Sequence, residues 1–177
     1  AYTDYFGMMD VTERMVAFAA EQVTGSSTVT FQGNEINLAP PWNRESLREA
    51  IRSRCGIDYI DYPEAKALHA AMKEAGIDAS PKATWGKLVD TLLGDVVEPT
   101  LIQPTFITDY PRDISPFAKT VPGDEKHVER FEMFIGGMEA GNAFTELNDP
   151  IDQEARFVEM RDLYADEDDE ATPLDED

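Results

Sequence analysis

Positive charge and cysteine are both scarce in this chain of 177 residues. Its 15 lysines and arginines stand against 36 aspartates and glutamates, which gives a formal net charge of -21. Such an acidic balance argues against a broad surface for the phosphates of nucleic acid or for anionic lipid. The single cysteine, Cys55, excludes an internal disulfide, and we expect it to have a structural role.

Long hydrophobic runs are absent as well, and no signal peptide is recognisable. A cytoplasmic protein without a membrane partner is therefore the expectation. What the chain does contain is 42% hydrophobic and 10% aromatic residues, a composition typical of a folded protein. At this length we expect one domain, with or without a small insertion.

Hydrophobic periodicity and turn residues predict a mixture of helices and strands. A helix is expected from about residue 4 to residue 22, followed by a β-hairpin that turns at Gly33-Asn34. Asn43 is a plausible cap for the next helix. Residues 57–98 carry two further helical patterns and are interpreted as a small helical insertion between sheet-forming segments.

The second half of the chain returns to sheet. Strands are predicted at residues 105–110 and, between residues 128 and 147, on both sides of Gly136-Gly137. Asp149-Pro150 begins a last helix, whose inward side chains should be Ala155, Val158 and Leu163. We therefore divide the chain into residues 1–56, the insertion 57–98, residues 99–165 and an acidic loop or disordered tail at 166–177.

The predicted hairpin places carboxylates among aromatic side chains. With a two-residue turn, Phe134 lies opposite Glu139, and Glu132 points to the same face as Glu139. Two carboxylates this close repel each other unless a proton or a cation intervenes, and Mg²⁺ is commonly held by one or two carboxylates together with phosphate oxygens. The alternative interpretation is a pair of solvent-facing glutamates at a sheet edge.

Asn142, Phe144 and Glu146 alternate along the second strand, so they share a face that suits an amine ligand. The alternative is an aromatic on the core side, flanked by polar edge residues. Because Glu139 and Asn142 are three residues apart, one shared pocket needs a β-bulge, for which Gly141 is the natural position. A glycine there can hold a positive φ, so Gly141→Val is expected to disturb the pocket.

Two segments closely resemble the catalytic domain of lysyl-tRNA synthetase, a class II aminoacyl-tRNA synthetase: PTFITDYPRDISPFAK (104–119) and RFEMFIGGMEAGNAFTELNDPIDQEARF (130–157). The opening AYTDYFGMM resembles the end of the motif 2 strand of that family and the start of its next helix, so the resemblance covers essentially the whole chain. It implies an α+β fold, an incomplete class II antiparallel sheet with flanking helices and a small helical insertion.

The resemblance also implies roles for the hairpin residues. Glu132 and Glu139 match glutamates that help bind ATP and its Mg²⁺, whereas Asn142, Phe144 and Glu146 match positions that line the lysine pocket. The full-length parent is expected to be a homodimer that activates lysine with ATP as lysyl-adenylate and transfers it to tRNA(Lys). No covalent enzyme intermediate is involved, so no catalytic nucleophile is assigned here.

Motif 2 and motif 3 of that family, whose arginines contact the nucleotide, lie outside this sequence, as do motif 1 and the anticodon-reading domain. The fragment alone is therefore expected to be inactive and not to bind nucleic acid directly. Two alternatives stay open. One is the paralogue that attaches lysine to elongation factor P, which the segment GNAFTELNDP and the helical insertion disfavour. The other is a non-catalytic acidic module that binds a basic partner or calcium.

Overall fold

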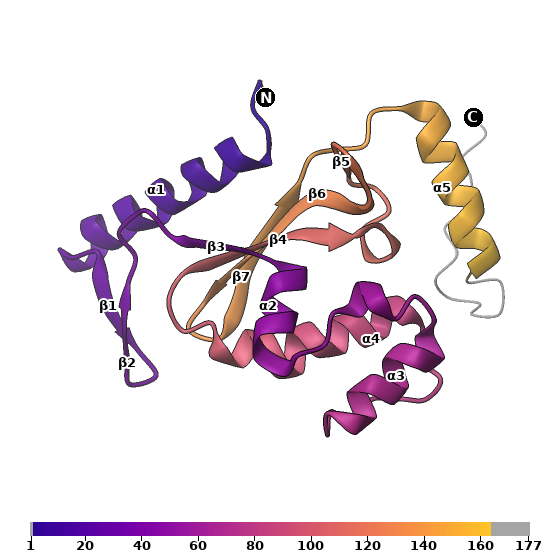
Figure 1. Cartoon of the computed structure of the whole chain (residues 1–177). Helices are drawn as coiled ribbons and strands as arrows, with labels where there is room; N and C mark the ends of the chain where they lie inside the picture. The colour runs from indigo at the N-terminus through magenta and orange to yellow at the C-terminus, as the bar shows by residue number, and fades with distance from the viewer. Residues whose placement is uncertain (1, 164–177) are drawn as a thin grey trace.

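A five-stranded mixed sheet lies at the centre of the protein, with α1 on one face and α2 to α4 on the other (Figure 1). The structure is a computed structural model that describes residues 2–163, and side chains up to residue 159. The predicted acidic tail and the predicted inward orientation of Leu163 lie outside those limits. Within the described part of the chain, no helix has both the length and the apolar character needed to cross a membrane.

The sheet follows the order β3, β4, β6, β5, and β7 also pairs with β6. All pairs are antiparallel except β3 with β4, which run parallel, so the predicted antiparallel sheet contains one parallel pair. A polar strand such as β3 gives no alternating hydrophobic signal, which is why it was not predicted. The strands are β3 (Asn43–Ser46), β4 (Thr105–Pro111), β5 (Thr120–Val121), β6 (Asp124–Ile135) and β7 (Met138–Phe144).

Helix α1 (Tyr5–Thr24) confirms the first predicted helix, and the Asp4 side chain caps it by accepting a hydrogen bond from the Gly7 amide at 2.9 Å. The helix carries two apolar stripes. One packs on the sheet, where it contributes Tyr5 and Met9 to a core cluster. The other is exposed, although it is the stripe with the regular spacing in the sequence; it consists of Met8, Val11, Met15 and Phe18.

The hairpin of β1 (Thr28–Phe31) and β2 (Asn34–Asn37) turns one residue earlier than predicted. Its two loop residues are Gln32 and Gly33, not Gly33 and Asn34. Both have positive φ, 48° and 82°, as the right-handed twist of a two-residue hairpin requires. The prediction of a hairpin is confirmed and the position of its turn is corrected.

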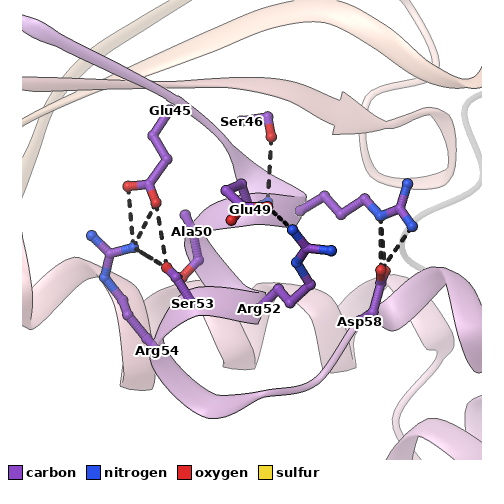
Figure 2. A network of polar contacts seen from close by, with 9 residues as sticks. Glu45, Ser46, Glu49, Ala50, Arg52, Ser53, Arg54 and Asp58 are labelled. Atoms are coloured by element: carbon purple, nitrogen blue, oxygen red, sulfur yellow. Dashed lines mark hydrogen bonds and ion pairs between the residues drawn. The ribbon is translucent and has the colours of Figure 1, made fainter.

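Helix α2 (Leu47–Cys55) is capped by Ser46, whose hydroxyl accepts from the Glu49 amide at 3.3 Å, so the predicted cap at Asn43 is wrong. Asn43 begins β3 instead. Figure 2 shows ion pairs that hold this helix: Arg54 reaches back to Glu45 of β3 at 3.1 Å. Another arginine of the helix, Arg48, makes a bidentate contact with Asp58, with distances from 2.7 to 3.1 Å.

The predicted insertion forms α3 (Ala65–Glu74) and α4 (Trp85–Leu92), with α4 continued by a π-helical turn, η2 (Leu93–Val97), and a 3-10 turn, η3 (Glu98–Thr100). Two further 3-10 turns are η1 (Tyr59–Asp61) and η4 (Arg112–Ile114). Leu68 and Leu88 from the two helices share one hydrophobic core with Leu47 of α2 and Ile107 of β4. The division at residues 57 and 98 stays a prediction.

Helix α5 (Pro150–Leu163) begins where predicted, and the Asp149 carboxylate caps it by accepting from the Ile151 amide at 2.9 Å. Its predicted inward face is wrong. Ala155 and Val158 are exposed, whereas Arg156 is buried. The face of α5 that contacts the segment before β5 is formed by Arg156, which bonds the carbonyls of Pro116 and Ala118, and by Phe157, whose ring centroid lies 5.1 Å from that of Phe117.

Candidate active site

The hairpin of β6 and β7 has the predicted two-residue turn, with Ile135 opposite Met138. Gly136 and Gly137 have φ of 66° and 76°, values that glycine adopts without strain. Their amides donate to the carbonyls of Ile102 and Leu101, at 2.9 and 3.0 Å. The turn is therefore fixed to the segment that leads into β4.

A β-bulge interrupts the hairpin next to Gly141, which confirms the predicted break in pairing. Phe134 lies opposite Glu139, but its neighbour Met133 lies opposite Gly141, so Ala140 is the extra residue. The suggested positive φ at Gly141 is wrong, because its backbone is outside the left-handed region.

The bulge changes which side chains meet. Beyond it, Glu132 lies directly opposite Asn142 and Arg130 opposite Phe144. The amide nitrogen Nδ2 of Asn142 donates to Oε1 of Glu139 at 2.8 Å. Glu132, Glu139 and Asn142 are thus brought to one region of the sheet, and β-strand alternation places Phe144 on the same face as Asn142.

Glu132 is 8% exposed and forms an ion pair that sequence reasoning missed. Its Oε1 lies 2.7 Å from Nη2 of Arg130, whose other nitrogen Nη1 donates to Oγ of Ser115 at 3.2 Å. The Arg130 guanidinium also lies 5.1 Å from the ring centroid of Tyr110. The cation that the two glutamates require is thus supplied in part by the chain itself, and the only sequence signal was the spacing Arg130-x-Glu132.

The pKa of the Glu132 carboxyl is raised, and burial is the main cause. Arg130 opposes this shift because a nearby positive charge favours the ionised carboxylate. The negative charge of Glu139 adds to the shift. The two predicted glutamates are therefore close enough to influence each other electrostatically.

The other two predicted residues lie toward the opposite end of the hairpin. Phe144 is partly buried and packs against the core that α2 and α4 share with the sheet. Glu146 is exposed, and its backbone lies opposite Ala118. Among residues 2–159, whose side chains the structure describes, the Glu146 carboxylate has neither a hydrogen-bond nor an ion-pair partner.

A separate cavity of about 210 Å³ lies between η1, α4 and the end of β4. Aromatic and proline side chains, Tyr59, Pro63, Trp85 and Pro111, form part of its walls, together with Ile60 and four charged residues. None of the five predicted site residues lines it. The candidate site is therefore the surface of the hairpin and not this cavity.

Among the described residues, no group of three or more histidine, cysteine, aspartate or glutamate side chains is placed to hold a metal ion. Glu132 and Glu139 nevertheless fit the needs of Mg²⁺. That ion usually takes one or two carboxylates and completes its shell with water and substrate phosphate. The electrostatic influence of Glu139 on the buried Glu132 is what an intervening cation would relieve.

Comparison with known proteins places these residues in a family. Residues 1–176 match the model of class II tRNA synthetases (D, K and N). A lysine–tRNA ligase of Chloroflexus aurantiacus is 48% identical over 177 residues, which cover all of this chain and 36% of the relative. Lysine–tRNA ligases of Synechococcus sp. (strain CC9605) and Pelotomaculum thermopropionicum are 46% and 44% identical, again over the whole chain. The chain spans about a third of the length of these curated relatives.

Proposed function

Because the chain belongs to the class II tRNA synthetases, we propose that it is part of a lysine–tRNA ligase and that hairpin β6–β7 forms a wall shared by the lysine and ATP sites. The complete ligase would activate lysine with ATP as lysyl-adenylate and then transfer it to tRNA(Lys). The observation that carries this proposal is the bulge at Ala140. It puts Asn142 opposite Glu132 and within hydrogen-bond distance of Glu139.

Glu146 is proposed to bind the side-chain ammonium of lysine. An exposed carboxylate without a partner among the described residues is free to form a charge-assisted hydrogen bond with an amine. Phe144, anchored by its contacts with the core, would cover the aliphatic stem, and Asn142 would donate to or accept from a polar group of the substrate. The three residues thus supply an anion, an apolar wall and an amide.

Glu132 and Glu139 are proposed to face ATP, with Mg²⁺ bound beside its phosphates. The ion supplies positive charge that stabilises charge developing on the phosphate. The role of the protein here is to fix the positions of the Glu132 and Glu139 carboxylates. Arg130 keeps the buried Glu132 neutralised by a 2.7 Å ion pair, and the Asn142 contact fixes Glu139.

The two alternatives of the sequence analysis are less well supported. The 44–48% identity with lysine–tRNA ligases across the chain favours the tRNA ligase over the paralogue that modifies elongation factor P. The acidic module was suggested by the net charge of -21 and by the acidic tail, which lies outside the described residues. A homodimeric parent and a cytoplasmic location stay predictions.

The test is lysine-dependent exchange of pyrophosphate into ATP by the complete protein, followed by charging of tRNA(Lys) and of elongation factor P in parallel. We expect pyrophosphate exchange that depends on lysine, and attachment of lysine to tRNA(Lys). Attachment of lysine to elongation factor P alone would establish the paralogue. The absence of exchange with any amino acid would favour the binding module. We expect the isolated 177-residue chain not to catalyse exchange, because adenylate formation depends on positive charge around the phosphate and the resemblance assigns the nucleotide-contacting arginines to motif 2 and motif 3.

A further inference from the structure

Arg156 of α5 is buried to 3% exposure, which is unusual for a charged side chain on a surface helix. Its guanidinium makes five hydrogen bonds. Two go to the Asp152 carboxylate, at 2.9 and 2.7 Å, and one goes to the Thr120 hydroxyl at 2.9 Å. The remaining two go to the backbone carbonyls of Pro116 and Ala118, at 3.0 and 2.8 Å.

The backbone that Arg156 holds is the pairing partner of the segment around Glu146. The Lys119 amide donates to the Thr145 carbonyl at 2.8 Å, and the Leu147 amide donates to the Phe117 carbonyl at 2.9 Å. Between these two bonds, Glu146 lies opposite Ala118. The segment 116–119 is therefore the direct support of the Glu146 backbone.

The two sets of contacts occupy opposite edges of segment 116–119. Successive carbonyls of an extended chain point in opposite directions. Those of residues 116 and 118 go to Arg156, whereas the carbonyl of residue 117 and the amide of residue 119 pair with the segment around Glu146. Arg156 thus takes the place of a neighbouring strand, and it needs the five donors in a planar fork that only arginine provides.

We propose that Arg156 is a positioning residue for the lysine site: through the segment 116–119 it fixes where the Glu146 carboxylate meets the substrate amine. The inference rests on the proposed function of Glu146. Arg156 does not touch the substrate, and its charge is balanced by Asp152, so it does not compete with the ammonium for Glu146. Substitution of Arg156 should therefore weaken the binding of lysine and leave the binding of ATP unchanged.

The test compares Arg156→Gln with Arg112→Gln in the complete ligase. Arg112 is a matched control because it also bonds α5, through Glu159 at 3.1 Å, but has no hydrogen bond to the segment 116–119. For Arg156→Gln we expect the KM for lysine to rise about tenfold to a hundredfold, since small misplacements of a binding group have effects of this order, while the KM for ATP stays within about twofold. For Arg112→Gln we expect both constants to stay within about twofold.

Amide hydrogen exchange provides a readout that does not depend on activity. Arg156→Gln should speed exchange at the amides of Lys119 and Leu147 by about tenfold or more, while Gly136 and Gly137 at the hairpin tip keep their protection. Thr120→Val removes one of the five bonds and covers the case in which Arg156→Gln does not fold. It should give the same pattern with a smaller amplitude.

Unchanged exchange at Lys119 and Leu147, or an equal rise of the lysine and ATP constants, would overturn the positioning role. A wild-type protein that shows no lysine-dependent activity would instead overturn the proposed function, and the exchange measurement would still decide whether Arg156 supports the Glu146 segment. The two failures are therefore distinguishable.

Discussion

Glu132 lies in the β6–β7 hairpin and Glu146 two residues beyond its end, and their surroundings are opposite. Glu132 is buried and already paired with Arg130 at 2.7 Å. Glu146 is exposed, and its carboxylate has no partner in the part of the chain that the structure describes. A buried carboxylate needs a partner within the protein, because an unpaired buried charge destabilises the fold. An exposed carboxylate is solvated by water and needs no such partner. On the proposed roles, we expect the first to contribute to both stability and binding, and the second to binding alone.

An alanine inserted between Gly141 and Asn142 should have the largest effect. Asn142 would then lie opposite Phe131 instead of Glu132, and Asn142 and Phe144 would turn to the other face of the sheet. Lysine affinity should fall by roughly 3–6 kcal/mol, because the charged hydrogen bond and the aromatic cover each contribute about 1.5–3. Calorimetric titration of the complete ligase measures this loss. Deletion of Ala140 is the matched control, because it removes the unpaired residue and leaves Glu132 opposite Asn142; wild-type affinity of the insertion variant would refute the role of this register.

Arg130→Met is expected to have the next largest effect, on stability. It leaves the buried Glu132 carboxylate without its cation, and breaking a buried ion pair typically costs about 3–5 kcal/mol. Urea unfolding at neutral pH provides the free energy of unfolding. The double variant Arg130→Met/Glu132→Gln should recover much of the loss, because no unpaired charge remains. If the double variant is no more stable than the single one, the pair does not have the role described here.

Glu146→Gln tests the other half of the comparison. It preserves volume but removes the anion facing the substrate ammonium, so lysine affinity should fall by roughly 1.5–3 kcal/mol. The free energy of unfolding should change by less than about 0.5 kcal/mol, since an exposed carboxylate without a partner contributes little. Lysine and ATP Michaelis constants, measured together with urea unfolding, separate these effects. Glu154→Gln, at an exposed position of α5, should alter none of them. Equal losses for lysine and ATP would contradict the assignment.

The hairpin was predictable because its geometry is local. The glycine pair fixes a two-residue turn, and the three-residue offset between Glu139 and Asn142 requires a break in pairing if both are to share a face. Both features are present. The sequence could not show that the extra residue is Ala140 and not Gly141, since either position restores the register.

Two arginines were missed for a different reason. Arg130, which is partly buried, and Arg156, which is buried, both resemble surface residues in the sequence. Their positions depend on partners far along the chain, such as Ser115 and the carbonyl of Ala118. The last helix shows the consequence: its periodicity suggested that Val158 points inward, but Arg156 is the buried residue, and its neighbour Phe157 packs on Phe117. Hydrophobic periodicity gives no signal for hydrogen bonds from an arginine to backbone carbonyls.

The pH dependence of stability should differ between wild type and Asp152→Asn. The hydrogen bonds from Arg156 lower the pKa of Asp152, so this carboxylate stabilises the fold at pH values above its unfolded pKa, about 3.9. That contribution is lost as the pH falls from about 5 through the lower folded pKa. It should be below about 1 kcal/mol, since Asp152 is 39% exposed and partly screened by solvent. Between neutral and acidic pH, the free energy of unfolding should fall more steeply for the wild type than for Asp152→Asn. Identical slopes would contradict the pairing of Asp152 with Arg156.

Gly141→Ala should have the smallest effect and separates the bulge from the turn. A positive φ was suggested for Gly141, but its backbone lies outside the left-handed region, and an added Cβ would meet only the flexible end of Met133, at 3.5 Å. The free energy of unfolding should therefore change by less than about 0.5 kcal/mol, or rise slightly as the unfolded chain loses freedom. Gly136→Ala is the matched contrast. That residue has φ of 66°, and its added Cβ would lie 3.0 Å from Phe31, so the left-handed backbone alone should cost about 1–2 kcal/mol. Urea unfolding of the two variants measures these changes. Equal losses in the free energy of unfolding would mean that the bulge, like the turn, depends on a glycine backbone.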